Sequence, residues 1–303
     1  MHAELVRTQT RDGLRLDGAL AEPILARSAS KGLPLQGSSI PTAAILLHGV
    51  AGNFYNSSTF ESVIPRLLDL GLVVLTVNTR GHDSVYSATL GTVRSRLGAA
   101  YETVDDCRAD LAAWIAFLVA RGHQSIVLIG HSLGAIKAVY SQALEKSPHV
   151  AAVIAISPPR LSYAAFMNAP ESSIFFESFH AAEQMVNEGR GTELFNARFP
   201  FPILITAAGY IDKYGPAERY NLLRHAGELS CPALFLYGGK ELTSGGIAFA
   251  GLPEALLALP NADRRSVAVV EEADHMYTGR GSQLADQISA WLQDKELNRS
   301  ERR

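Results

Sequence analysis

The sequence has little cysteine and no long apolar run, and both absences exclude classes of protein. Only two cysteines, Cys107 and Cys231, occur among the 303 residues. They lie far apart without metal-ligand spacing, so we expect reduced structural thiols, with a single disulfide as the alternative. The longest uncharged apolar run, residues 111–120, is about half of a membrane span. A disulfide scaffold and a transmembrane helix are therefore not expected.

The chain also lacks an excess of charge of either sign. Its formal net charge is −3, with both signs scattered along the sequence. This distribution provides no electrostatic footprint for nucleic acid or for an anionic membrane. Residues 1–7 contain no apolar core of a secretory signal. These observations predict a soluble, cytoplasmic protein without a nucleic-acid or membrane partner, and they do not indicate its oligomeric state.

Short apolar runs alternate with longer amphipathic runs along most of the chain. The short runs are continuous and rich in β-branched residues and leucine, which is typical of strands buried on both faces of a parallel sheet. A turn at Arg11-Asp12-Gly13 joins the first two runs as an antiparallel pair. Residues 26–41, rich in Ser, Gly and Pro, are expected to form an exposed loop. The predicted strands are residues 5–10, 14–21, 43–47, 72–77, 125–129, 150–156, 233–237 and 266–270.

The amphipathic runs have helical periodicity, so the fold class is α/β with a doubly wound, mainly parallel sheet of about eight strands. Such sheets bind ligands at the carboxyl ends of their strands. The apolar stripe of one helix is Val104, Cys107, Leu111, Trp114, Ile115 and Leu118. The stripe of the last helix is Leu284, Ile288, Trp291 and Leu292.

One stretch, residues 158–227, interrupts this alternation and is dense in aromatic residues. An insertion that is too apolar for a plain loop, directly after a strand, is typical of a cap over the carboxyl edge of the sheet. The expected organisation is therefore a core made of residues 1–157 and 228–303, with a mostly helical cap between them. Most of the aromatic side chains are expected to form the cap's own core.

Five residues, Gly130-His131-Ser132-Leu133-Gly134, join a predicted strand to an apolar helix. A turn this sharp holds its central residue in a strained conformation, and the flanking glycines let neighbouring backbone approach without a Cβ clash. The turn presents the Ser132 hydroxyl above the sheet, at the positive end of the following helix. Ser132 is therefore the candidate nucleophile.

A serine hydroxyl needs a base, and the base needs an anion that orients it. His275 lies a few residues after the last predicted strand, in a loop that can reach back over the sheet, and is the candidate base. Glu241 follows another strand and two glycines, and is the candidate acid. Asp274, adjacent to the base, and Asp212, in the cap, are the alternative acids.

Two backbone amides are expected to form an oxyanion hole, where negative charge develops during acyl transfer. One is the amide of Leu133, directly after the nucleophile. The other is the amide of Val50, in the glycine-containing loop after the strand at 43–47. No metal or cofactor is expected, because the sequence contains neither a clustered His/Cys ligand set nor a G-x-G-x-x-G loop at Ser132.

Further side chains are candidates for the wall of a substrate pocket. His48 follows a strand, and His131 lies within the turn, where its side chain is expected to point away from the Ser132 hydroxyl. A few cap aromatics are expected to face the site. The candidate pocket residues are His48, His131, Phe166, Phe175, Phe176 and Tyr210.

Together these motifs resemble the α/β-hydrolase superfamily, of the serine esterase and lipase type. The resemblance covers nearly the whole chain, and the order Ser132, Glu241, His275 is the order of nucleophile, acid and base in that fold. It rests on His48-Gly49, Arg80-Gly81-His82, the turn at Ser132, the turn at 238–241, and Asp274-His275. Two departures are Glu241, where Asp is more frequent, and Asn78, where many relatives carry Asp.

The resemblance implies an α/β-hydrolase sheet, with the cap inserted after the strand that follows the nucleophile helix. It also implies hydrolysis of carboxylic esters through an acyl-enzyme. The aromatic content of residues 158–227 favours small or medium substrates with an apolar or aromatic part. A serine in the turn argues against haloalkane dehalogenases and epoxide hydrolases, which use aspartate there. Amidase, lactonase, thioesterase, carbon–carbon hydrolase and acyltransferase activities use similar residues and stay open. So does a non-catalytic small-molecule-binding protein of the same fold.

Overall fold

The computed structural model describes residues 2–23, 42–170 and 172–300, and the side chains up to residue 294. The predicted loop at 26–41 lies entirely outside this range. The central sheet has eight strands in the order β1-β2-β4-β3-β7-β8-β11-β12. The strands are β1 (Ala3–Gln9), β2 (Arg15–Ala21), β3 (Ala43–Leu47), β4 (Val73–Val77), β7 (Ile126–His131), β8 (Val150–Ile156), β11 (Ala233–Gly238) and β12 (Arg265–Val270).

All strands from β4 to β12 in this order pair in parallel, whereas β2 pairs antiparallel with both β1 and β4. The predicted doubly wound, mainly parallel sheet is therefore confirmed. Each predicted strand overlaps an observed one, and no end differs by more than two residues.

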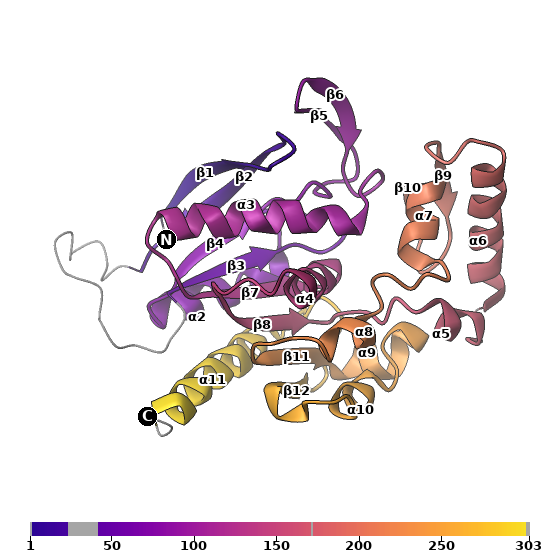
Figure 1. The fold of residues 1–303 in the computed structure, drawn as a ribbon. Helices are drawn as coiled ribbons and strands as arrows, with labels where there is room; N and C mark the ends of the chain where they lie inside the picture. The colour runs from indigo at the N-terminus through magenta and orange to yellow at the C-terminus, as the bar shows by residue number, and fades with distance from the viewer. Residues whose placement is uncertain (1, 24–41, 171, 301–303) are drawn as a thin grey trace.

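Helices cover both faces of the sheet, and the strand residues alternate between them (Figure 1). Along β3, Ala43, Ile45 and Leu47 join one apolar cluster, while Ala44 and Leu46 join the other. The first cluster includes helices α3 (Cys107–Ala120), α4 (Leu133–Glu145), α8 (Leu222–Ala226) and α10 (Leu252–Leu257). The second includes α2 (Val63–Asp69) and α11 (Gly281–Ser300). Both predicted apolar stripes belong to these clusters.

A small hairpin of β5 (Tyr86–Leu90) and β6 (Val93–Leu97) projects beside the main sheet (Figure 1). It was not expected from the sequence. Most of its residues are exposed or only half-buried, so it lacks the continuous apolar pattern that marks the central strands.

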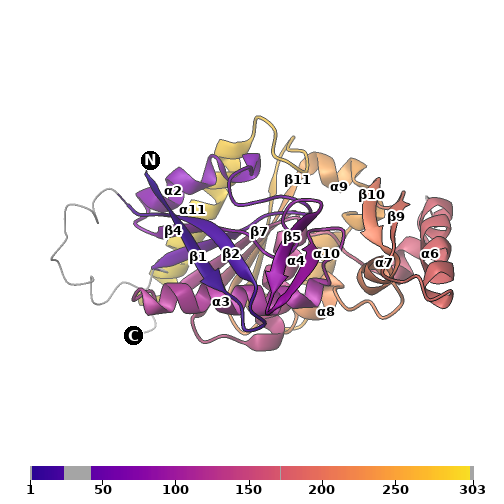
Figure 2. The same ribbon diagram turned by 90° about the horizontal axis from the view of Figure 1, so that it is seen from above.

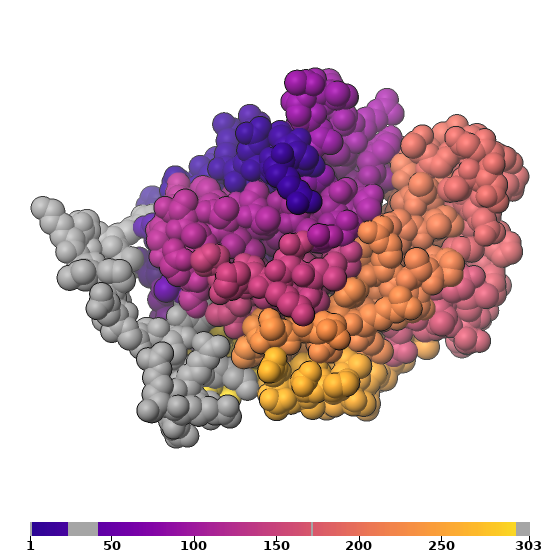
Figure 3. Space-filling view, viewed as in Figure 1, coloured from indigo at the N-terminus to yellow at the C-terminus, as the bar shows by residue number. Residues whose placement is uncertain are grey.

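The chain between β8 and β11 forms a lobe at one end of the molecule, beyond the carboxyl ends of the parallel strands (Figures 1 and 2). In the space-filling view this lobe stands apart in salmon and orange (Figure 3). Besides helices, it contains a two-stranded antiparallel sheet. Its elements are α5 (Tyr163–Met167), α6 (Ser172–Asn187), β9 (Leu194–Ala197), β10 (Ile203–Thr206), α7 (Ala207–Tyr214) and α8.

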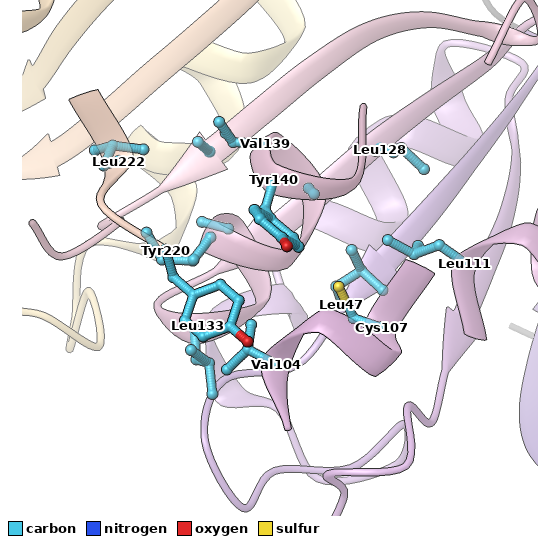
Figure 4. Packing of buried hydrophobic residues seen from close by; sticks show 14 of the residues in the cluster. Leu47, Val104, Cys107, Leu111, Leu128, Leu133, Val139, Tyr140, Tyr220 and Leu222 are labelled. Carbon is cyan, nitrogen blue, oxygen red and sulfur yellow. The ribbon is translucent and has the colours of Figure 1, made fainter. Parts of the chain in front are cut away.

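The last part of this segment packs on α4, the helix that follows Ser132. The rings of Tyr140 in α4 and Tyr220, just before α8, lie 5.0 Å apart in an edge-to-face arrangement. Figure 4 shows Tyr140 and Tyr220 among buried side chains of the same cluster, with Leu222 nearby. Aromatic pairs of this kind contribute about 0.5–1.5 kcal/mol beyond their burial, so this contact helps to hold the lobe against the core.

Candidate active site

Ser132 lies at the junction of β7 and α4, in the strained conformation that the motif predicts. Its φ is 55° and its ψ is −120°, a region that non-glycine residues rarely adopt. A Cβ on Gly134 would lie 2.3 Å from the Leu47 carbonyl oxygen, and one on Gly130 would lie 2.2 Å from the Gly134 carbonyl oxygen. The two glycines therefore let β7, α4 and the end of β3 approach one another closely.

The structure brings the candidate base and the candidate acid together. His275 Nδ1 lies 2.8 Å from Glu241 Oε2. Glu241 is buried at the start of α9 (Gly239–Ser244), where its Oε1 accepts hydrogen bonds from Ser157 Oγ at 2.5 Å and from Gly238 N at 2.8 Å. These donors fix one carboxylate oxygen, so the other is left to orient the imidazole.

The two alternative acids have other partners. Asp274 Oδ1 accepts hydrogen bonds from the amides of Met276 and Thr278, and so closes the turn that carries His275. Asp212, in α7 of the lobe between β8 and β11, forms an ion pair with Arg219. The geometry thus favours Glu241 over both.

His131 connects the nucleophile turn to the loop of the base. Its Nε2 lies 2.8 Å from the carbonyl oxygen of His275, and the two imidazole rings are 4.9 Å apart. No hydrogen bond joins the Ser132 hydroxyl to His275 among the described residues. Catalytic hydrogen bonds are often long in unliganded enzymes and shorten when substrate binds.

The two candidate oxyanion donors flank the nucleophile. Leu133 is the first residue of α4, and first-turn amides have no partner within their helix. The Val50 amide donates no hydrogen bond within the described part of the chain. A Cβ on its neighbour Gly49 would lie only 3.4 Å from Ser132 Cβ, so this loop lies directly against the nucleophile.

The candidate pocket residues are less exposed than a pocket wall requires. His48 is only 3% exposed, and its ring contacts Thr79 and the Gly49 carbonyl group. Phe166 and Phe175 are 1% and 0% exposed, with ring centroids 5.5 Å apart. The buried Tyr210 donates a hydrogen bond to the Phe199 carbonyl group. Half-buried Phe176 contacts the Phe175 ring. The ring contacts of these aromatic side chains lie within the lobe between β8 and β11, and their role at the substrate stays a prediction.

Sequence reasoning missed several polar residues next to the site. Ser157, which supports Glu241, directly follows β8, so its position at a strand end was the available signal. Lys137 interrupts an otherwise apolar stretch of α4, yet it is 1% exposed and pairs with Glu102. A lysine on a buried helix face indicates a buried partner, but the sequence does not indicate which carboxylate that partner is.

Replacing His131 with glutamine is expected to weaken the pH dependence of folding stability. Burial lowers the pKa of His131 from 6.5 to about 4. Below pH 6.5 the unfolded chain therefore binds the proton first, so His131 makes the protein less stable as the pH falls towards 4, by up to about 3 kcal/mol. Urea unfolding at several pH values should give a smaller loss for the variant. An unchanged slope between pH 6.5 and 4 would contradict this.

Within the described residues, no helix combines the length and apolar character needed to cross a membrane. The same residues contain no group of three or more His, Cys, Asp or Glu side chains suited to hold a metal ion.

The chain belongs to the alpha/beta hydrolase family, whose model matches residues 44–291. None of the proteins with a curated description matches it.

Solved structures with the same fold include several esterases. The esterase Pf2001 of Pyrococcus furiosus is 17% identical, with a TM-score of 0.62 over 97% of this chain and 91% of that one. Est1E of Butyrivibrio proteoclasticus, bound to ferulic acid, is 14% identical, with a TM-score of 0.61 over 97% of this chain and 100% of that one. A monoacylglycerol lipase of Paleococcus ferrophilus is 16% identical, with a TM-score of 0.58 over 96% and 98% of the two chains.

Proposed function

We propose that this protein is a serine hydrolase that cleaves carboxylic esters through a Ser132–His275–Glu241 triad. The observation that carries the proposal is the buried Glu241 carboxylate, held 2.8 Å from His275 Nδ1 in the loop that contacts the strained Ser132 turn. Buried acid, imidazole and strained serine together are the parts that acyl transfer needs.

In this mechanism Ser132 Oγ attacks the ester carbonyl carbon while His275 Nε2 accepts the hydroxyl proton. The amides of Val50 and Leu133 stabilise the tetrahedral oxyanion. As the carbonyl group re-forms, the bond to the alcohol oxygen breaks, and His275 returns the proton to the leaving alcohol. Water activated by His275 then attacks the acyl-enzyme and releases the carboxylic acid.

The substrate in this proposal is a small or medium ester with an apolar or aromatic part, which binds beneath the cap at residues 158–227. The aromatic content of the cap and the structural likeness to esterases support this choice. We place the protein in the cytoplasm, as the sequence predicts.

The proposal is tested with a series of p-nitrophenyl esters of increasing acyl length, assayed beside matched amides and thioesters. We expect the esters to be cleaved fastest, and a fluorophosphonate probe to label Ser132, as mapped by mass spectrometry. Faster cleavage of an amide or thioester would reassign the reaction on the same residues. Absence of both turnover and labelling would favour a small-molecule-binding protein.

A further inference from the structure

A buried network of polar contacts runs from the cap to the loop that carries the Val50 amide. It begins at Lys213 in α7 of the cap and ends at the Gly49 carbonyl group. The residues between them are Glu102, Lys137, Thr79 and His48. Of the six residues, only His48 and Gly49 are neighbours in the sequence. None of the three triad residues belongs to this network.

At the cap end of this network, a carboxylate lies between two ammonium groups. Lys137 Nζ donates a hydrogen bond to Glu102 Oε2 at 2.6 Å, and Lys213 Nζ lies 3.8 Å from Glu102 Oε1. Their three side chains are at most 2% exposed. Burial alone would raise the pKa of Glu102, but the charges of Lys137 and Lys213 hold that pKa below its ordinary value.

The position of Glu102 is tightly constrained. A Cβ on Gly81 would lie 1.8 Å from Glu102 Oε2, so only glycine leaves space for the carboxylate there. Within the described residues, neither Lys213 Nζ nor Glu102 Oε1 has a hydrogen-bond partner. Lys213 therefore acts on Glu102 by charge, which is strong at this distance because water is excluded.

At the core end of this network, the hydrogen bonds fix the tautomer of His48. Lys137 Nζ donates to Thr79 Oγ1 at 3.0 Å, and the Thr79 amide donates to His48 Nε2 at 3.2 Å. Since Nε2 accepts a hydrogen bond, the ring proton is on Nδ1, which lies 2.7 Å from the Gly49 carbonyl oxygen. Burial also lowers the pKa of His48 to about 4, so the ring is neutral near pH 7.

The last contact bears directly on the oxyanion hole. The Gly49 carbonyl oxygen and the Val50 N–H belong to one planar peptide group, in which they point in opposite directions. The Gly49 oxygen also accepts a hydrogen bond from the Gly52 amide at 3.2 Å. Two donors therefore hold the oxygen, and in doing so they set the direction of the Val50 N–H.

We infer that Lys213 is a cap-borne positioning residue, which acts through Glu102, Lys137, Thr79 and His48 to aim the Val50 amide at the reacting carbonyl oxygen. This inference rests on the proposed function. It makes the oxyanion hole depend on the docked cap, because loss of the Lys213 charge lets the Glu102 carboxylate, and the Lys137 ammonium that stays paired with it, shift in position.

The first test compares Lys213→Met with Arg198→Met, which removes an exposed cap charge paired with Glu177. An oxyanion donor acts only in the transition state, so we expect Lys213→Met to lower kcat about tenfold with KM unchanged, and to slow fluorophosphonate labelling of Ser132 similarly. Its Tm should not fall, because a buried charge gives way to an apolar side chain of similar length while Glu102 keeps Lys137. Arg198→Met should behave as wild type.

The second test uses two variants of His48 that differ in what they can donate. Asparagine places an amide N–H near the position of Nδ1, so His48→Asn should keep kcat within about tenfold of wild type. His48→Gln lacks a donor at that position and should lower kcat by about 100-fold, as does loss of one oxyanion donor.

The inference is wrong if Lys213→Met keeps wild-type kcat, changes only KM, or loses activity in proportion to a fall in Tm. It is also wrong if His48→Gln is as active as His48→Asn. A wild-type protein that neither turns over esters nor reacts with the probe would overturn the proposed function itself, and the inference with it.

Discussion

Replacement of Ser132 by alanine is expected to lower kcat for ester hydrolysis by about a million-fold, which is the effect of removing the nucleophile in comparable triads. In the proposed mechanism only Ser132 forms the acyl-enzyme. Its removal would therefore leave only the residual rate that oxyanion stabilisation and substrate binding provide. Turnover of p-nitrophenyl acetate and butyrate, followed with enzyme in excess, measures the loss.

Ser141→Ala provides the control, because Ser141 is a buried serine further along the same helix. It should retain wild-type turnover and labelling. If Ser132→Ala kept a substantial part of the esterase activity, the nucleophile would have to be another residue.

The second large effect is expected from Glu241→Gln, which should lower kcat by about 10,000-fold, as the equivalent change does in a well-studied triad. Glutamine keeps the shape of the side chain but removes the charge that stabilises the protonated His275. Its amide nitrogen could also face the ring and favour the wrong tautomer. Steady-state kinetics at pH 8 measure the loss, and a Tm close to wild type would separate it from unfolding.

Asp274→Asn is the matched comparison, because Asp274 adjoins the base but accepts hydrogen bonds from residues 276 and 278 of its own turn. We expect a loss of less than tenfold, since asparagine can accept the same bonds. If Asp274→Asn were the more damaging of the two changes, the acid role would pass to Asp274.

Most of the core could be predicted because its signals are local. Strands buried on both faces of a sheet are continuous apolar runs, and the flanking helices carry apolar stripes, so β3 and β8 were predicted with their observed ends. The β5–β6 hairpin has neither signal, since its residues are mostly exposed or half-buried.

The site was predictable to the extent that the fold brings strand ends together. Glu241 and His275 each follow a strand, and β11 and β12 are neighbours, so their loops meet at one edge. The roles of Lys137 and Lys213 were not predictable in this way. Their partner Glu102 lies in a loop outside the strand ends, and one sequence does not indicate which buried charges will meet. For the same reason, the sequence did not indicate which aromatic side chains of residues 158–227 would contact one another.

The position of the lobe between β8 and β11 has a consequence for how such proteins diversify. Strands β8 and β11 pair in parallel, so the sheet requires a crossover between Ile156 and Ala233 whether or not a cap is present. The entropic cost of closing a connection rises only slowly with its length. The segment within this crossover can therefore be exchanged without altering the strand order, and residues 132, 241 and 275, which lie outside it, keep their places. On the role that we infer for Lys213, a replacement segment would need its own cation opposite Glu102.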